Sequence, residues 1–246
     1  MARTIAIGDI HGAVKALTQV IDLIKPGPGD EFIFMGDYVD GWPDSAEVVD
    51  FLIQFQKTNR CVFIRGNHDV WCELWLQGNK PDTIWLQHGG KATIESYGRL
   101  PDESRYEHLE FFAQLENYKV DAENRLFTHA GYSTLEGPAY EFRDGQYSWD
   151  RSLWETAFKM QQKQKETNIN PADYPKKFQL YKEIYIGHTP TIFYNIATPV
   201  HALNIWNTDT GAGFDGKLSA IEINSQEIWQ SDPVPELYPG ITGRAR

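Results

Sequence analysis

Short apolar runs that end in glycine and a polar residue recur in the first part of the chain. They are TIAIGD at 4–9, EFIFMGD at 31–37 and CVFIRGN at 61–67. Because they are almost continuously hydrophobic, these runs are typical of strands buried on both faces. The segments between them carry apolar residues at helical spacing, and the second opens with proline and acidic residues, as a helix start does. The pattern predicts a β-α-β-α-β unit with parallel strands over residues 1–70.

The remaining pattern extends the same domain. Residues 70–116 are predicted to be helical, and 118–132 to form a hairpin that turns at DAEN. A capped helix is expected over 148–164, within a lysine-rich stretch at 159–177 that we interpret as a solvated helix end and loop, and as an insertion. Strands are expected at EIYIGHT, ALNIWNTDTG and KLSAIEI. We find no repeat or linker, so the prediction is one domain over 1–230 and an irregular Pro/Gly-rich tail over 231–246.

Composition and charge restrict the partners. The formal net charge of −11 argues against a nucleic-acid backbone or an anionic membrane surface as the main partner. A small phosphorylated substrate remains compatible, because bound cations can reverse the sign of charge locally. Cys61 and Cys72 are isolated and favour buried thiols over a disulfide framework. The sequence shows no signal peptide and no run long enough to cross a bilayer, so we expect a cytoplasmic protein.

Metal-binding residue types gather at the ends of five predicted strands. They are Asp9, His11, Asp37, Asn67, His68, His129 and His188. Each alone has a structural explanation, such as helix capping by Asp9 or turn formation by Asp37 and Asp40. Because strand ends in an α/β sheet converge on one edge, their recurrence there instead favours a shared site. Glycines precede several of them, as expected where the backbone turns tightly around a crowded site.

The motifs GDIHG, GDYVDG, RGNHD, HAG and GHTP follow one another across residues 8–190. This series resembles the calcineurin-like metallophosphoesterases, and more narrowly the phosphoprotein phosphatases. GGKATIESYG and NTDTGAGFDGKLSAIEI resemble bacterial members in particular. The resemblance implies an α/β fold, a four-layer α-β-β-α sandwich of two mixed sheets, with two divalent metal ions at the sheet edge.

The resemblance also assigns ligands by position. It implies that Asp9, His11 and Asp37 hold one ion, and that Asp37 bridges to a second ion held by Asn67, His129 and His188. Oxygen and nitrogen ligands without thiolate suit manganese, which we take first, and equally iron, zinc or magnesium. Many related phosphodiesterases have a second histidine in the last motif, where this chain has Pro190. That difference favours the phosphatase branch.

The same resemblance implies the chemistry. A hydroxide that bridges the metals would attack phosphorus, and His68 would protonate the leaving oxygen while Asp40 orients it and raises its pKa. His68 could instead only hydrogen-bond near the site. Arg65 and Arg151 resemble phosphate-binding arginines, although Arg151 could equally be a surface residue at a helix start. His88, His108 and His201 match no ligand position and are interpreted as structural or surface residues.

Position 41 departs from the family pattern. The usual motif is Gly-Asp-x-x-Asp-Arg-Gly, whose arginine contacts phosphate, whereas this chain has Gly41 followed by Trp42. Loss of one charge-assisted contact, roughly 1.5–3 kcal/mol, would weaken binding about ten- to a hundredfold. Three explanations stay open. Another cation such as Lys91 or Arg143 supplies the contact, Trp42 stacks on an aromatic substrate such as phosphotyrosine, or the substrate is a nucleotide.

The nucleotide explanation has its own motif. PDS at 43–45 resembles the matching segment of symmetrical diadenosine tetraphosphate hydrolases. Our prediction is a metal-dependent phosphatase of phosphate monoesters on phosphoproteins (Ser/Thr or Tyr), with a symmetrical dinucleoside-polyphosphate hydrolase or other nucleotide phosphohydrolase as the alternative. A scaffold that only binds metal is the weakest reading, because every ligand and the acid pair are present. The expected partners are a phosphorylated protein or a small phosphorylated substrate, with no nucleic acid and no membrane.

Overall fold

Two five-stranded mixed sheets form the centre of the molecule. The computed structural model describes residues 2–143, 145–167 and 170–244. The first sheet has the order β10-β9-β1-β2-β3, and the second has the order β4-β5-β6-β8-β7. The strands are β1 Thr4–Ile7, β2 Glu31–Phe34, β3 Arg60–Phe63, β4 Tyr118–Val120, β5 Arg125–Thr128, β6 Glu183–Ile186, β7 Val200–Ala202, β8 Ile205–Asn207, β9 Ser219–Glu222 and β10 Ile228–Gln230.

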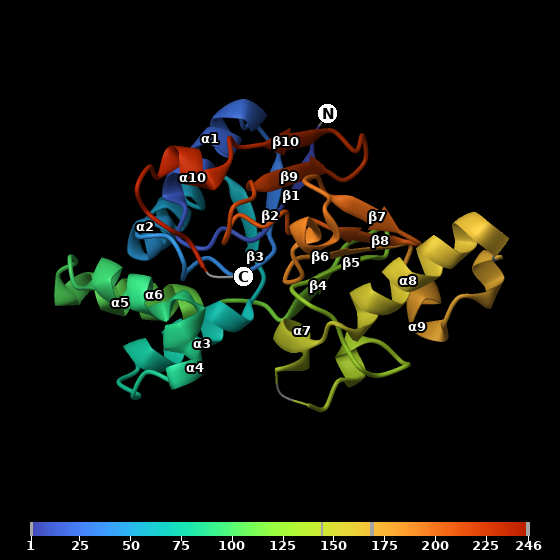
Figure 1. The fold of residues 1–246 in the computed structure, drawn as a ribbon, viewed down its shortest axis with the longest axis horizontal. Coiled ribbons are helices and arrows are strands. Elements are labelled where there is room, and N and C mark those ends of the chain that lie inside the picture. The colour runs from blue at the N-terminus through green and yellow to red at the C-terminus, as the bar shows by residue number, and fades with distance from the viewer. Residues whose placement is uncertain (1, 144, 168–169, 245–246) are drawn as a thin grey trace.

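Helices cover the outer face of each sheet (Figure 1). The α-helices are α1 Val14–Ile24, α2 Ser45–Phe55, α3 Asn67–Leu76, α4 Thr83–Trp85, α5 Lys91–Tyr97, α6 Asp102–Ala113, α7 Gln146–Trp149, α8 Ser152–Thr167, α9 Lys176–Gln179 and α10 Val234–Leu237. The π-helical turn η1 spans Leu86–Gly90, and the 3₁₀ turns are η2 Pro138–Tyr140, η3 Pro171–Asp173 and η4 Thr191–Tyr194.

The predicted β-α-β-α-β unit is confirmed. Strands β1, β2 and β3 pair in parallel, with Ile5 opposite Phe32 and Phe32 opposite Cys61. Apolar residues of α1, including Leu17 and Ile21, and of α2, including Leu52, pack with the outer face of this sheet in one buried cluster. Near-continuous apolar strands follow from this arrangement, because both sheet faces are covered.

The two sheets face each other across a buried apolar layer. Ile33, Met35, Phe127, Tyr185 and Ile221 belong to this layer, and come from both sheets. A third cluster lies on the outer face of the second sheet, where Trp154 of α8 packs near Ile184 of β6. The layer order is therefore helix, sheet, sheet, helix, which confirms the predicted four-layer sandwich.

The region between β3 and β4 is helical, as predicted for 70–116, and β4 and β5 form the predicted antiparallel hairpin. One strand prediction was confirmed only in part. ALNIWNTDTG spans the end of β7 and all of β8, which pair antiparallel around a turn at Leu203. The positive φ of Leu203 marks this turn, which apolar periodicity did not reveal. Strand β10 also was not anticipated.

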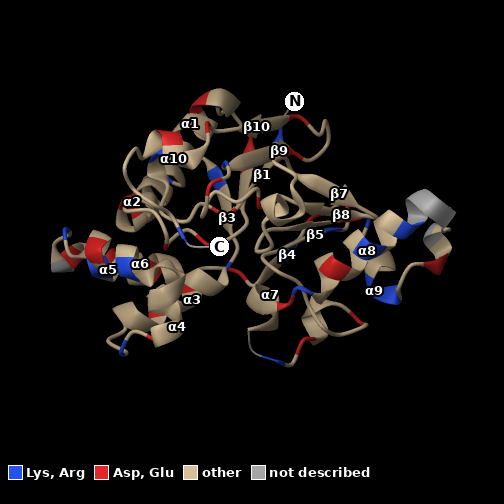
Figure 2. Cartoon of the chain, viewed as in Figure 1, with Lys and Arg blue, Asp and Glu red and all other residues tan. Residues whose placement is uncertain are grey.

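Helix α8 continues to Thr167, so part of the expected lysine-rich loop is helical, and residues 168–169 lie outside the described residues. Figure 2 shows basic residues on α8 and α9, at the end of the molecule away from the C-terminal label. None of the helices in the described part of the chain has the length and apolar character that a membrane crossing requires.

The C-terminal segment returns to the middle of the molecule (Figure 1). The part expected to be irregular contains α10, and Tyr238 after it is buried and stacks on Trp42, with ring centroids 5.2 Å apart. The Tyr238 hydroxyl donates a hydrogen bond to Asp44, and the backbone N–H of Arg244 donates one to the carbonyl of Gly213. These contacts hold the segment against the sheet edge where the candidate ligands lie.

Candidate metal centre

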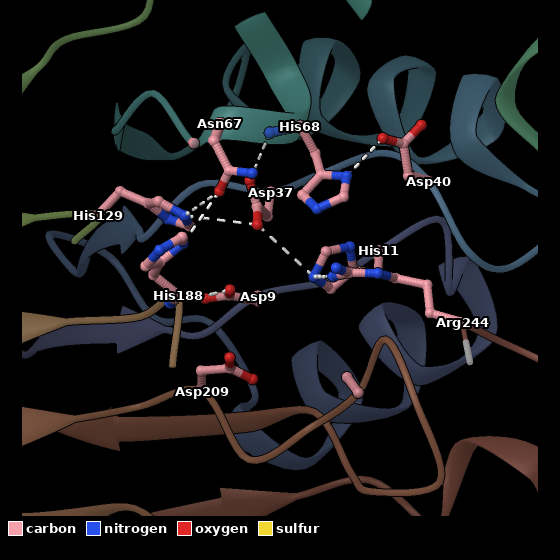
Figure 3. Close-up of polar contacts among 12 residues, drawn as sticks. Asp9, His11, Asp37, Asp40, Asn67, His68, His129, His188, Asp209 and Arg244 are labelled. Carbon is pink, nitrogen blue, oxygen red and sulfur yellow. Dashed lines mark hydrogen bonds and ion pairs between the residues drawn. The ribbon is translucent and has the colours of Figure 1, made fainter. Parts of the chain in front are cut away.

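The carboxyl ends of β1, β2, β3, β5 and β6 bring the predicted ligands together. Asp9, Asp37, Asn67, His129 and His188 follow these strands directly or within a few residues, and all are buried. Figure 3 shows their side chains pointing toward a common centre, with His11 and His68 beside them. The sequence prediction of a shared edge site is thus matched in space for all these residues.

Asp37 lies at the middle of the cluster. Its Oδ2 is 3.6 Å from Nε2 of His11 and 3.4 Å from Nε2 of His129. Two groups of donor atoms share it, one with His11 and His68 and one with His129 and His188, and within each group the atoms lie within 4.8 Å of one another. A carboxylate shared by two donor groups is the arrangement that a bridging ligand requires.

Backbone carbonyls orient two of the histidines. Nδ1 of His11 lies 3.2 Å from the carbonyl of Val39, and Nδ1 of His129 lies 2.7 Å from the carbonyl of Met35. A carbonyl can only accept, so Nδ1 carries a proton in each ring, and Nε2 is the nitrogen that faces Asp37. The rings are therefore positioned to donate electron pairs to a cation.

The second donor group is organised by hydrogen bonds among its members. Asn67 Oδ1 is 3.0 Å from Nδ1 of His188 and 3.3 Å from Nε2 of His129. Arg151 donates its Nε–H to Nε2 of His188 at 3.2 Å, which places this predicted phosphate-binding residue directly beside the centre. Trp149, just before it in the chain, packs edge-on against the His188 ring.

The residues present fit divalent cations. Asp9 Oδ1 is buried without a hydrogen-bond partner, and a nearby cation would satisfy it. Burial, followed by the neighbouring Asp209 carboxylate, raises the pKa of Asp9 well above its usual range. Burial likewise raises the pKa of Asp209 to about 6. Carboxylates crowded together out of water call for positive charge, and the nitrogen and oxygen donors suit manganese, iron, zinc or magnesium alike.

Backbone strain is concentrated here. His11, Asp37 and His188 have φ values of 54°, 54° and 67°, in the left-handed region that costs such residues about 1–3 kcal/mol each. The prediction that glycines allow a crowded site holds at Gly66, where a Cβ would lie 2.1 Å from Asp37 Oδ1. It holds again at Gly187, where a Cβ would lie 2.1 Å from Asp9 Oδ1. The strained backbone and the glycines therefore allow the donor atoms to lie close together.

His68 and Asp40 form a buried pair beside the first donor group. Nδ1 of His68 is 2.5 Å from Asp40 Oδ2. Asp40 also accepts hydrogen bonds from Nε1–H of Trp85 at 2.7 Å and from the hydroxyl of Thr93 at 2.6 Å. The carboxylate is thereby fixed by α4 and α5, and holds the His68 ring with its other nitrogen free to face the centre.

Asp69 was not singled out by sequence reasoning although it ends the RGNHD motif. Its carboxylate accepts hydrogen bonds from the backbone N–H groups of Asp37, Tyr38 and Gly66, at 2.8, 2.9 and 2.8 Å. Burial and the nearby Asp37 charge raise the pKa of Asp69 to about 7. This side chain ties the loop after β2 to the start of α3, and so sets the position of Asp37.

Arg65 is not brought into the cluster. Its guanidinium forms an ion pair with Glu73 on α3 and donates a hydrogen bond to the carbonyl of Phe112 at 2.7 Å. These partners lie on the helical region that covers β3, so the predicted phosphate contact would require Arg65 to leave them. The suggested substitutes Lys91 and Arg143 are exposed, and Arg143 lies over the ring of Phe142.

The explanation that Trp42 stacks on an aromatic substrate beside Gly41 is wrong. Trp42 is fully buried, donates a hydrogen bond to the carbonyl of Ala212 at 2.7 Å and is covered by Tyr238. The space beside Gly41 holds Arg244, because a Cβ at Gly41 would lie 3.0 Å from Cγ of Arg244. Sequence reasoning missed Arg244, because nothing in the Pro/Gly-rich tail predicts that this arginine reaches the site.

Aromatic side chains border the centre next to His68 and His188. The Trp71 ring packs edge-on against His68, with centroids 5.2 Å apart, and against Trp149 at 4.9 Å. The His88 ring lies parallel to Trp71, with centroids 6.3 Å apart. Trp149 is 43% exposed and His88 is exposed, so a flat ligand can reach them. We call Trp71, His88 and Trp149 the aromatic rim.

Comparisons with known proteins agree with this geometry. A profile of the family described as calcineurin-like phosphoesterase matches residues 2–211. The asymmetrical bis(5′-nucleosyl)-tetraphosphatase PrpE of Halalkalibacterium halodurans is 28% identical over 258 residues, covering 98% of this chain and 96% of that protein.

Solved structures share the fold. A putative diadenosine tetraphosphatase superimposes with a TM-score of 0.63 at 17% identity, covering 94% of this chain and 93% of its own. The cold-active protein-tyrosine phosphatase of a Shewanella species gives a TM-score of 0.56 at 14% identity, covering 94% and 81%. From the profile match, the full-length relative and the converging ligands, we conclude that the chain belongs to the calcineurin-like phosphoesterase family and is a hydrolase acting on phosphoric esters.

Proposed function

We propose that the chain hydrolyses dinucleoside polyphosphates of the diadenosine tetraphosphate type. The observation that carries this proposal is the aromatic rim, which lies directly beside the two donor groups through His68 and His188. A planar base stacked on an exposed indole gains about 1–3 kcal/mol, and its phosphate chain then extends toward the centre. A phosphoserine side chain offers nothing flat for the rim to bind.

The relatives support the same choice. Curated proteins that cover nearly all of this chain are named asymmetrical bis(5′-nucleosyl)-tetraphosphatases, including those of Oceanobacillus iheyensis and Halalkalibacterium halodurans. We therefore propose asymmetrical cleavage, in place of the symmetrical cleavage that the PDS segment suggested. Water adds across one P–O–P bond, and the products are a nucleoside triphosphate and a nucleoside monophosphate.

In this proposal two divalent cations, manganese first, are held by Asp9, His11, Asp37, Asn67, His129 and His188. When bound, they lower the pKa of a water molecule and neutralise phosphoryl oxygens. Side chains of the protein supply the remaining roles. His68 donates a proton to the leaving oxygen, Asp40 keeps its ring oriented, and Arg151 holds a phosphate oxygen. Free thiols at Cys61 and Cys72 agree with a reducing cytoplasm as the location.

Hydrolysis of phosphate monoesters is the second candidate. The observation that favours it is the His68–Asp40 pair, because an alkoxide leaving group depends on an acid far more than a nucleotide leaving group does. Protein serine, threonine or tyrosine phosphates would fit this chemistry. They would not use the aromatic rim in the same way, except for phosphotyrosine.

The two candidates separate in one assay. The Mn²⁺-loaded protein is given diadenosine tetraphosphate, a phosphotyrosine peptide and a phosphoserine peptide, and the products are separated by chromatography. We expect the highest kcat/KM for the dinucleotide, with ATP and AMP as products. Two molecules of ADP would contradict asymmetrical cleavage, and a higher kcat/KM for either peptide would contradict the proposed substrate.

A rim variant provides the control. Trp149→Ala removes the most accessible ring, and should lower kcat/KM for the dinucleotide about tenfold through KM. Hydrolysis of a small alkyl phosphate should change little, because that substrate makes no stacking contact. Equal losses on both substrates would mean that Trp149 only supports His188.

A further inference from the structure

We propose that Arg244, from the C-terminal segment, is the phosphate-binding guanidinium of this site and takes the place of the side chain that Gly41 lacks. The inference rests on phosphoric ester hydrolysis by this centre, and holds whether or not the substrate is a dinucleotide.

The side chain of Arg244 fills the space beside Gly41. A Cβ built at Gly41 would lie 3.0 Å from Cγ and 3.3 Å from Cδ of Arg244. From there the guanidinium reaches inward, and its Nη1 lies 3.0 Å from Nε2 of His11 (Figure 3). A guanidinium is therefore present on the Gly41 side of the donor groups, although the chain supplies it from the far end of its sequence.

The segment is built to hold Arg244 in this position. Gly243 passes so close to Trp42 that a Cβ there would lie 2.8 Å from Cζ2 of the indole and 2.9 Å from the carbonyl of Gly213. The backbone N–H of Arg244 donates to that carbonyl at 2.9 Å. Phe214 lies beneath the guanidinium, with its ring centroid 4.8 Å from Cζ. Cation–π contact and the backbone bond together restrict where the guanidinium can point.

The hydrogen bonds of the guanidinium are incomplete. Its Nε is buried without a partner, which leaves a donor of a charged group unsatisfied. Nη1 faces Nε2 of His11, the same nitrogen that faces Asp37. His11 Nε2 has one lone pair, so a cation and Arg244 cannot both use it. A centre loaded with metal frees the guanidinium for a different acceptor.

Charge balance makes a phosphate the suitable acceptor. Among the six expected ligands only Asp9 and Asp37 are carboxylates, so two divalent cations leave the ligand shell with net positive charge. Without cations, the nearby carboxylates Asp37, Asp40 and Asp209 attract Arg244, although burial opposes its charge. Once those charges are neutralised, an anion with paired oxygens matches the planar donors of the guanidinium.

The surroundings leave room for such a change. A cavity of about 340 Å³ lies against Arg244 and is also lined by Trp42, Phe214 and Ile241. The Arg244 side chain is therefore not packed on all sides, and its guanidinium can exchange His11 for another acceptor.

The test uses inorganic phosphate as the ligand, so that nucleotide specificity does not enter. Calorimetry measures phosphate binding to Mn²⁺-loaded wild type, Arg244→Ala, Arg244→Lys and the control Arg60→Ala, and elemental analysis gives the metal content of each. Arg60 is an exposed arginine at the start of β3, with 73% of its side chain accessible. We expect phosphate binding to weaken about ten- to a hundredfold in Arg244→Ala, and less in Arg244→Lys. Arg60→Ala should bind as wild type does.

A second variant leaves Arg244 in place. Gly243→Ala forces the segment off Trp42, and should weaken phosphate binding in the same direction. Metal content should stay at the wild-type level in all variants, or rise at low Mn²⁺ in Arg244→Ala because His11 loses a competitor.

Three results would overturn the proposal. The first is unchanged phosphate binding in Arg244→Ala. The second is tighter phosphate binding in that variant, which would mean that Arg244 blocks the site. The third is loss of metal from that variant, which would mean that Arg244 stabilises the metal centre. A failed dinucleotide assay together with weakened phosphate binding would instead reject only the proposed substrate.

Discussion

The ligand cluster and the recognition groups around it are built from different parts of the chain. Each candidate ligand stands at or just after the carboxyl end of a strand, and neighbouring strands bring these ends together. The groups that would recognise substrate come instead from the helical region after β3, from α7, and from the C-terminal segment. The sheets thus fix the chemistry, while the longer connections determine what reaches it.

The ligand cluster and the recognition groups also differ in how their conformations are stabilised. The ligands sit in strained backbone and among buried like charges, so metal binding stabilises them. The recognition groups, such as Trp149 and Arg244, are partly exposed and rest on ring contacts and a few hydrogen bonds. Changes to the first region should therefore abolish function, and changes to the second should alter affinity and substrate choice.

The largest effect is expected at the shared ligand. Asp37→Asn removes the carboxylate that both donor groups contact, so metal content and turnover should fall together. Loss of several kcal/mol of transition-state stabilisation corresponds to roughly four powers of ten in kcat. Elemental analysis after Mn²⁺ loading measures the metal content of the variant, and circular dichroism checks that it is folded. Two equivalents of metal in the variant would rule out a bridging role.

The next effect concerns the acid. His68→Asn should lower kcat on an alkyl phosphate by roughly two to four powers of ten. An activated aryl phosphate or a dinucleotide should suffer much less, because its leaving oxygen hardly needs a proton. Steady-state kinetics on the three substrates gives the comparison. Equal losses on all of them, at unchanged metal content, would show that His68 is not the general acid.

A smaller effect is expected at Gly41, where the loop after β2 meets Arg244 of the C-terminal segment. Restoring the family arginine by Gly41→Arg should fail, because Gly41 has a φ of 98° and the new Cβ meets Arg244. Strain of about 1–3 kcal/mol should lower the melting temperature by roughly 2–10 °C. Phosphate binding should weaken, as Arg244 is displaced. Tighter phosphate binding with an unchanged melting temperature would mean that position 41 tolerates the side chain and Arg244 adds nothing.

The smallest effect lies at the opposite edge of the first sheet. Asp30 accepts hydrogen bonds from the Arg3 backbone and side chain, with Oδ2 2.6 Å from Nη2, and from the backbone of Gly27. Burial opposes its charge, but Arg3 lowers the pKa of Asp30 to about 2. A pKa depressed below the unfolded value gives about 2 kcal/mol of stability above pH 4, which is lost as pH falls from about 4 toward 2.

Urea unfolding of wild type and Asp30→Asn at several pH values measures this contribution. The difference between the two proteins should be largest at pH 7 and shrink below pH 4. Glu31→Gln is the matched control, because Glu31 pairs with the exposed Arg60 at 3.5 Å and should cost a few tenths of a kcal/mol at most. A difference for Asp30→Asn that does not depend on pH would contradict the ion-pair explanation. Catalytic constants should not change in either variant.

Local patterns predicted the β-α-β-α-β unit and the gathering of ligand residue types at strand ends, whereas the four-layer sandwich and the assignment of each ligand followed from the family resemblance. Asp37 and His129 are recognisable because each follows an apolar strand, and the parallel pairing of neighbouring strands brings such strand ends close together. The orientation of Asp40 could not be predicted in the same way, since Trp85 and Thr93, which fix it, come from a helical region without a motif for that role.

The covering of Trp42 could not be predicted from the sequence. Trp42 was considered as a surface for stacking on an aromatic substrate, yet the C-terminal segment covers it through Tyr238 and Gly243. A contact between residues about two hundred positions apart leaves no periodic trace in either segment. Arg244 was missed for the same reason, and the ion pair of Arg65 with Glu73 on α3 was not anticipated.

Anomalous scattering from crystals soaked in Mn²⁺ tests the central claim most directly. The account predicts two anomalous peaks, one beside His11 and Asp9 and one beside His129 and His188, with the Asp37 carboxylate between them. The Arg244 guanidinium should be turned away from His11 Nε2 in the same crystals. A single peak, or no peak near Asp37, would contradict a centre that holds two cations at the strand edge.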